Sequence, residues 1–295
     1  MDNFAFYTDK EKKLKELRSN EEKIELKPGT EIIGPFAFRT PNAKEIILPD
    51  SVEVVQRYAF EGCQNLQRVV FGKGIKKIYS RIFHGCYKLN EIKFAGDDVS
   101  NLEFIDASGQ DRTLLYGFTK FMLDCNVRTK SSDETDSIRM IEKFLKTKAP
   151  QTTLKITVGE RSLRIPLFIR IHNYFALNDV LKKWLTDKNN NQSQWKTLTY
   201  FTDTATEDYS AALELYFLDG NINALKYLKG WTYSELVHVI KFGEYETFME
   251  ILKCDFLTDD ELKSLVLYLT ENQMIEAMAY LMEYMKKNKN TDFSL

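Results

Sequence analysis

The sequence predicts an α+β protein in which a short β-rich solenoid precedes a mainly α-helical domain. Apolar residues recur every 22 or 23 residues between residues 24 and 94, and a fixed period of this length is typical of stacked repeat units. From Glu207 to Lys287 the apolar residues instead recur at helical spacing, in segments separated by short polar breaks. We therefore expect three parts: residues 1–105, residues 106–199 and residues 200–295.

Composition narrows the class of protein. Hydrophobic residues make up 43% of the 295 residues and charged residues 28%, which is too apolar for a disordered chain. No run of 18 apolar residues is present, so we expect no membrane span and no membrane partner. The four cysteines are too few for a disulfide scaffold, and the first residues lack the apolar core of a signal peptide. These observations favour a reduced, cytoplasmic location.

The segment before the repeats, from Asp9 to Asn20, is charged and rich in helix-forming residues. Leu14 and Leu17 stand three residues apart, which predicts a narrow apolar stripe on a helix. We expect this helix to cap the open first coil of the solenoid.

The repeats consist of short strands separated by turns. Equivalent apolar residues step through the sequence in columns: Leu26, Leu48, Phe71 and Phe94; Phe38, Phe60 and Phe83; Leu66 and Leu89; Cys63 and Cys86. Each repeat begins with a strand whose alternate side chains point inward, and then turns at a Pro- or Gly-containing sequence. One such coil cannot bury its apolar side alone, so successive coils must share a core.

These residues resemble the BspA-like class of leucine-rich repeats. The segment from Ala43 to Cys63 carries most of that pattern, namely Ile46, Leu48, Pro49, Ser51, Val52, Val55, Ala59, Phe60 and Cys63. The resemblance covers about residues 22–96 and implies a leucine-rich-repeat solenoid, a fold used mostly as a binding scaffold. In the first repeat Pro41 stands in place of the cysteine. Cys63 and Cys86 are interpreted as stacked core positions, because a buried free cysteine packs as a small hydrophobe.

The middle part, residues 106–199, is expected to mix helices and strands. Its apolar patterns predict helices over Leu114–Asp124, Ile138–Lys146 and Phe168–Leu185, and a β-hairpin from Thr153–Val158 to Arg161–Leu167 around Gly159-Glu160. Pro150 should end the second of these helices, because proline cannot continue a helix from within.

Three stretches of the C-terminal part share one pattern of apolar helix, polar break and apolar helix. They are Leu215–Leu228, Val239–Leu252 and Leu267–Leu281, with breaks at Asp219-Gly220-Asn221, Gly243-Glu244 and Glu271-Asn272. This pattern resembles ankyrin-like helix pairs, although the Thr-Pro-Leu-His turn of ankyrin repeats is missing. We therefore expect an α-solenoid. With the BspA-like repeats, the chain resembles uncharacterised leucine-rich-repeat proteins of low-GC bacteria.

The sequence carries no recognisable catalytic or metal-binding motif. His84, His172 and His238 are isolated from one another, without the spacing of zinc ligands. Nucleophile-elbow and phosphate-loop motifs are also missing, and Gly72-Lys73-Gly74 aligns with the turn at Pro49-Asp50-Ser51 of the preceding repeat. We expect a non-enzymatic protein with no cofactor and no metal site.

The side chains between the inward-facing ones form the outer surface of the first strand of each repeat. Residues proposed to contact a protein partner there are Glu45, Ile47, Arg68, Val70, Glu91 and Lys93. The column Lys23, Glu45, Arg68 and Glu91 alternates in sign, so neighbours can pair across coils. Ile47 and Val70 should form a small apolar spot among charges, as in many protein interfaces. Alternatively, this face packs on the chain's own C-terminal domain.

A nucleic-acid-related role is the alternative function. Basic Lys155, Arg161, Arg164 and Arg170 lie near Tyr174 and Phe175, and this combination can hold single-stranded nucleic acid. The acidic helices could instead act as a phosphate mimic and inhibit a nucleic-acid-binding protein. A third interpretation is that these charged faces pair within the fold.

Charge is segregated along the chain. Residues 106–199 carry a net charge of +6, whereas residues 200–284 carry −11. We expect the acidic helices to fold back partly on the basic segment, leaving surplus acid at the helix breaks. Such an outer face, with Asp219, Glu244, Glu246 and Glu271, should attract a basic protein and repel nucleic acid.

Overall fold

The structure is a computed structural model that describes residues 4–8, 10, 12–105, 111–112, 134–167, 181, 183–185 and 204–288. The helix predicted at Leu114–Asp124 lies outside these residues, and so does most of the one predicted at Phe168–Leu185. The chain divides into two compact units. The first is built from the described parts of residues 1–129 and 153–194, and the second from those of residues 130–152 and 195–295. Residues 106–199 thus contribute to both units.

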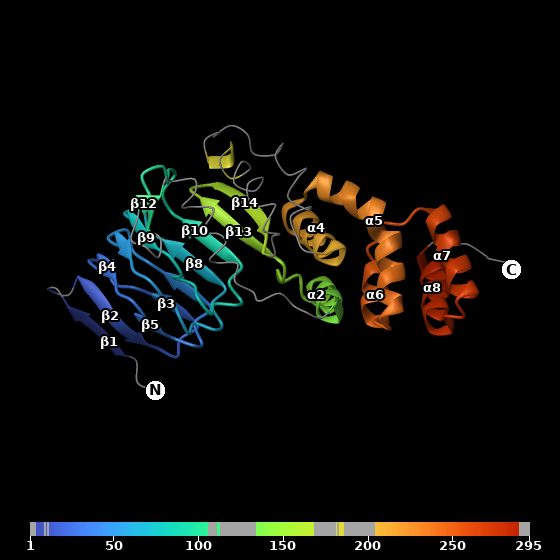
Figure 1. The fold of residues 1–295 in the computed structure, drawn as a ribbon, viewed down its shortest axis with the longest axis horizontal. Coiled ribbons are helices and arrows are strands. Elements are labelled where there is room, and N and C mark those ends of the chain that lie inside the picture. Colours follow the sequence, from blue (N-terminus) through green and yellow to red (C-terminus); the bar gives the residue numbers. More distant parts are fainter. Residues whose placement is uncertain are drawn as a thin grey trace. The chain divides into compact units, whose positions relative to one another are not determined.

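The first unit is a β-solenoid with two sheets (Figure 1). Sheet A contains β1 (Phe4–Thr8), β2 (Lys13–Arg18), β4 (Ile32–Ile33), β7 (Val54–Val55), β9 (Lys77–Tyr79), β11 (Glu103–Ile105) and β12 (Asp111–Arg112) in that order, with β5 (Phe38–Arg39) paired to β2. Sheet B has the order β14 (Arg161–Pro166), β13 (Thr153–Val158), β10 (Glu91–Phe94), β8 (Arg68–Phe71), β6 (Glu45–Ile47) and β3 (Lys23–Glu25). The α+β class and the solenoid are as the sequence predicts.

The repeat columns form the core between the sheets. Ile46, Val69 and Ile92 are paired neighbours in parallel strands and are fully buried. Phe38 and Phe60 stack with ring centroids 4.9 Å apart. Because the strands are parallel and in register, each side chain meets its equivalent in the next coil.

The cysteines occupy a buried column. Cys63 and Cys86 are 0% and 4% exposed, and the Cys86 thiol donates to the Phe60 carbonyl at 3.2 Å. In the first repeat the column is continued by Thr40, whose hydroxyl lies 3.3 Å from the Cys63 sulfur, and not by Pro41. Burial raises the pKa of the Cys63 thiol, so this column is unreactive packing.

The N-terminal segment is a β-hairpin and not the predicted capping helix. β1 and β2 are antiparallel, and the register shifts so that Phe6 faces Glu16 while Tyr7 faces Leu14. Lys15 is therefore an extra residue in β2, a β-bulge. The bulge places Leu14 and Leu17 on one side of the strand, and their spacing of three residues imitates a helical stripe.

The predicted hairpin at residues 153–167 is present as β13 and β14, with Gly159 in the left-handed conformation at the turn (φ +58°). β13 also pairs in parallel with β10, so that Ile92 faces Ile156 and Phe94 faces Val158. The hairpin thereby continues sheet B beyond the repeats.

The regular secondary structure of the second unit consists of helices in its described residues (Figure 1). Its helices are α2 (Glu134–Thr147), α4 (Ala205–Asp219), α5 (Ile222–Lys241), α6 (Tyr245–Leu252), α7 (Asp259–Glu271) and α8 (Ile275–Asn288). α2 covers the predicted helix over 138–146 and buries Ile138, Ile141 and Phe144 in the common core.

The polar breaks match the helix boundaries. α4 ends at Gly220, which has a φ of +65°, and Asn221 caps α5 by accepting hydrogen bonds from the N–H groups of Asn223 and Ala224. Thr204 and Thr258 form capping boxes with the glutamates three residues later. Each cap satisfies N–H groups that a helix leaves without partners in its first turn.

Candidate functional site

The outer face of sheet B carries two parallel columns of side chains. The strand register places Lys23, Glu45, Arg68, Glu91 and Lys155 in the first column. The second column contains Glu25, Ile47, Val70, Lys93 and Thr157. All six residues predicted from sequence, Glu45, Ile47, Arg68, Val70, Glu91 and Lys93, therefore lie together on one face.

Ion pairs connect the first column across the coils. Arg68 bridges its two neighbours, pairing through Nη1 with Glu45 and through Nε with Glu91 Oε2 at 3.2 Å. Lys23 Nζ lies 3.6 Å from Glu45 Oε2. These are the pairs that the alternating signs predict. The Arg68 side chain is only 32% exposed, so it lies across the face with its charge already compensated.

The second column presents a small apolar spot. Ile47 and Val70 face each other in adjacent strands and are both partly exposed. Glu25 precedes them and Lys93 follows, so the apolar pair has one charge of each sign at its ends. The combined surface has an apolar centre and charged residues along its border.

Two members of the columns, the partly exposed Lys155 and the buried Thr157, are found only in the structure. Lys155 and Thr157 extend the columns because β13 pairs with β10. About 60 residues separate these strands in the sequence, which breaks the period of 22–23 residues. The alternation of Thr153–Val158 is a visible signal for a strand, but it does not specify the neighbour.

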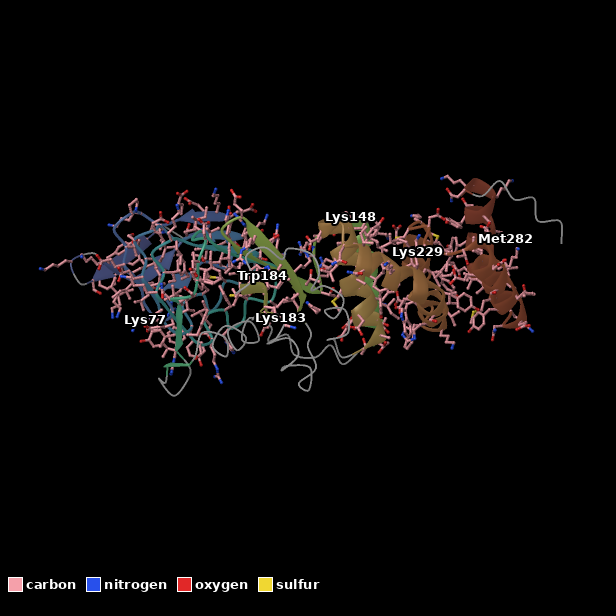
Figure 2. All side chains as sticks on the ribbon, turned by 90° about the horizontal axis from the view of Figure 1, so that it is seen from above. Lys77, Lys148, Lys183, Trp184, Lys229 and Met282 are labelled. Atoms are coloured by element: carbon pink, nitrogen blue, oxygen red, sulfur yellow. The ribbon has the colours of Figure 1, made fainter. Side chains whose placement is uncertain are left out.

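Two arginines of the predicted basic region make contacts inside the first unit. Arg164 is 6% exposed and donates from Nη1 to the Thr153 hydroxyl at 3.2 Å. Arg161 donates from Nη1 to the Trp184 carbonyl at 2.8 Å, and its guanidinium lies 5.3 Å from the Trp184 ring centroid. Trp184 accordingly lies beside the hairpin (Figure 2). Arg170, Tyr174 and Phe175 lie outside the described residues.

Two of the predicted acidic positions pair with basic residues of α2. Glu244 accepts from Arg139 at 3.0 Å, and Glu246 accepts from Lys146 at 2.8 Å. Hydrogen bonding to Lys146 lowers the pKa of the Glu246 carboxyl. The acidic helices thus contact part of the basic middle segment, as the charge segregation predicts. Asp219 and Glu271 are exposed at the other breaks.

A buried acid lies where α2, α4 and α5 meet. Glu235 of α5 is 5% exposed, and its Oε1 has no hydrogen-bond partner among the described residues. Burial raises the pKa of this carboxyl to about 7, and the nearby charge of Glu134 adds to the effect, whereas the Thr206 hydroxyl opposes it. Glu134 itself accepts from Thr206 at 3.3 Å and lies 3.1 Å from His238 Nε2.

The second unit also contains a cavity of about 510 Å³. Its lining comes from α6, the segment after it, and α8, and consists of Met249, Leu252, Lys253, Asp255, Tyr280, Glu283, Tyr284, Lys287 and Asn288. Tyr284 donates to Asp255 at 2.7 Å, and Lys253 pairs with Glu250 at 2.6 Å. The remaining charged residues of the lining, Glu283 and Lys287, are of opposite sign. Nothing in the sequence predicted it.

The His, Cys, Asp and Glu side chains that the structure describes form no group of three or more that could hold a metal ion. Among the same residues no helix combines the length and apolarity needed to cross a membrane.

Comparisons with known proteins agree with the repeat pattern. Residues 16–108 match the family described as "BspA type Leucine rich repeat region", in six copies. The matched residues include the repeat strands β3 to β11. No curated protein matches the chain.

Two solved structures of leucine-rich-repeat proteins are similar to part of the chain. The protein from T. pallidum is 17% identical, with a TM-score of 0.28, over 35% of this chain and 61% of that one. The protein from Bacteroides ovatus is 22% identical, with a TM-score of 0.28, over 36% of this chain and 33% of that one. The chain thus spans less than two thirds of either relative.

Proposed function

We propose that this protein is a non-enzymatic scaffold that binds a protein partner through the outer face of sheet B. The contact residues are Glu45, Ile47, Arg68, Val70, Glu91 and Lys93. The observation that carries the proposal is the apolar pair Ile47 and Val70 inside a border of compensated charges. BspA-type repeats support a role in protein interaction, because leucine-rich repeats mostly serve as binding scaffolds.

Covering this face costs little side-chain entropy. Arg68 is held by Glu45 and Glu91 before any partner arrives, so less side-chain entropy is lost on binding. A partner that covers Ile47 and Val70 gains hydrophobic free energy there and keeps the ion pairs intact at the border. Arginine is also enriched among residues that dominate binding energy.

We further propose that the partner is basic where it meets the helical unit. Glu271 and Glu276 are exposed on this unit, and the sequence of residues 200–284 carries a net charge of −11, although Glu207, Asp208, Glu214 and Glu235 are buried. A nucleic-acid role has less support, since Arg161 and Arg164 make contacts within their own unit. The free, buried thiols of Cys63 and Cys86 suit a reducing compartment, and we propose the cytoplasm.

Capture from a cell lysate with immobilised full-length protein tests the scaffold. We expect the proteins retained by the wild type to be lost with Arg68→Glu and with Val70→Lys. Lys77→Glu is the matched control, because Lys77 is also a partly exposed, ion-paired strand residue, but in sheet A (with Glu103, 2.7 Å). Circular dichroism should show that all three variants stay folded. Retention of the same proteins by folded Arg68→Glu and Val70→Lys would contradict the proposal.

A further inference from the structure

The first strand of the chain forms one edge of sheet A. β1 is the terminal strand in the sheet order and pairs with β2. Among the strands that the structure describes, none lies along its other edge. An open edge presents unpaired N–H and C=O groups, which another strand can use for hydrogen bonding.

The side chains of β1 place exposed apolar surface at this edge. Phe4 and Phe6 face Arg18 and Glu16 of β2, and they are 51% and 49% exposed. Tyr7 faces the buried Leu14 on the inner side. The two phenylalanines therefore lie side by side on the outer surface of sheet A, directly at its edge.

The edge strands of protein sheets usually carry charged residues, proline or a bulge, which prevent pairing with strands of other molecules. The other three terminal strands follow this rule: β3 carries Lys23 and Glu25, β12 carries Asp111 and Arg112, and β14 contains Arg161 and Pro166. β1 has the sequence Phe-Ala-Phe-Tyr-Thr and contains no charge and no proline. Of the terminal strands described, β1 is the one that has neither a charged residue nor a proline to prevent pairing with another strand.

We propose that β1 pairs antiparallel with β1 of a second copy of this protein. The register is centred on Ala5, so that Phe4 faces Phe6 of the second copy and the reverse pair forms by symmetry. All four rings then lie on the same outer surface, where cross-strand aromatic pairs stabilise a sheet. Ala5 meets Ala5 of the second copy on the opposite surface, and sheet A continues through both molecules.

A second copy fits this edge better than an unrelated protein. The spacing of Phe4 and Phe6 about Ala5 is symmetric, so the strand is complementary to itself, as a two-fold interface requires. An uncharged strand produces no repulsion between two copies. It also offers no charge through which a different partner could be selected.

Analytical ultracentrifugation of the full-length protein tests the association. Because a single pair of strands buries little area, we expect a reversible dimer with a dissociation constant in roughly the micromolar range. Phe4→Lys and Phe6→Lys should each weaken the dimer by at least about tenfold. Phe36→Lys is the matched control, since Phe36 is 44% exposed in the same unit but lies outside β1, and it should dimerise normally. A wild type that remains monomeric at about 100 µM, or equal dimerisation of all variants, would overturn the proposal.

Disulfide trapping tests the register. Paired residues of antiparallel strands have Cα atoms about 4.5–5.5 Å apart, which is within the range for a disulfide. Ala5→Cys should therefore yield a covalent dimer on mild oxidation. Lys15→Cys, an exposed position in β2 away from the edge, should yield none beyond the wild-type level. Similar yields from both variants would indicate random collision and would contradict pairing centred on Ala5.

Discussion

The rings of Phe60 and Phe83 stack in adjacent coils, with centroids 5.1 Å apart and planes inclined by 18°. They are 0% and 4% exposed. Phe38 extends the stack on one side, and Phe71 contacts Phe83 at 6.3 Å in an edge-to-face arrangement. This aromatic column lies inside the solenoid and connects three coils, so each ring stabilises its neighbours as well as its own coil.

Phe60→Ala should destabilise the solenoid strongly. The substitution removes a fully buried ring with stacking partners on both sides, and such a change costs about 3–5 kcal/mol. Urea unfolding would measure the loss. Phe36→Ala is the control, because Phe36 is 44% exposed. This substitution should lower the free energy of unfolding by clearly less. Equal effects of the two substitutions would contradict the assigned burial.

The repeats could be predicted because they constrain the sequence in two ways. Each inward residue must be apolar to be buried, and each must recur at the period of the coil to meet its equivalent. Ile46, Val69 and Ile92 satisfy both conditions, and their parallel pairing follows. The outward residue Arg68 precedes Val69 in its strand, and the same period therefore predicts its place in the charged column.

The parts of the structure that the sequence did not predict lack either the regular alternation of apolar residues or the period of the coil. Leu14 and Leu17 predicted a helix because a β-bulge at Lys15 disturbs the alternation of β2. The pairing of β13 with β10 has no sequence signal, since it depends on an insertion that returns the chain to the sheet edge. The ion pair between Lys146 and Glu246 joins residues 100 positions apart. Charge segregation predicts attraction between the two segments, but it does not specify which residues pair.

Glu214→Ala should destabilise the helical unit. Glu214 is fully buried in α4, and its Oε1 accepts hydrogen bonds from the N–H groups of Gln151 and Thr152 and from the Thr152 hydroxyl, at 2.6, 2.8 and 3.0 Å. Loss of the acceptor removes all three hydrogen bonds from a buried site, so we expect a cost of about 2–5 kcal/mol in chemical unfolding. Glu214→Gln keeps a side-chain oxygen and should cost less. If Glu214→Ala is no worse than the exposed control Glu276→Ala, the hydrogen bonds contribute no stability.

Nucleic acid should not bind tightly to the full-length protein. Arg161 and Arg164, two of the four predicted basic residues, make contacts within the first unit that compete with binding to phosphates. Anisotropy of labelled single-stranded DNA, duplex DNA and RNA should show no affinity above the roughly micromolar non-specific range, even at low salt. Tighter binding that falls steeply with added salt would favour the nucleic-acid role over the protein scaffold.

Glu235 should make the stability of the helical unit depend on pH. Its pKa is raised from 4.5 to about 7 in the folded protein, mainly by burial, so the folded state binds this proton more tightly than the unfolded state. The contribution is therefore fully present below pH 4.5 and is lost as the pH rises towards 7. A pKa shift of this size corresponds to about 3 kcal/mol in the free energy of unfolding.

Glu235→Gln provides the test, because glutamine stays neutral at every pH. We expect the variant to be more stable than the wild type at pH 8, by up to about 3 kcal/mol, and to differ little at pH 5. Urea unfolding followed by helical circular dichroism measures both differences. Glu276→Gln, an exposed substitution in α8, should show no such pH dependence. A Glu235→Gln effect that is the same at both pH values would contradict the raised pKa.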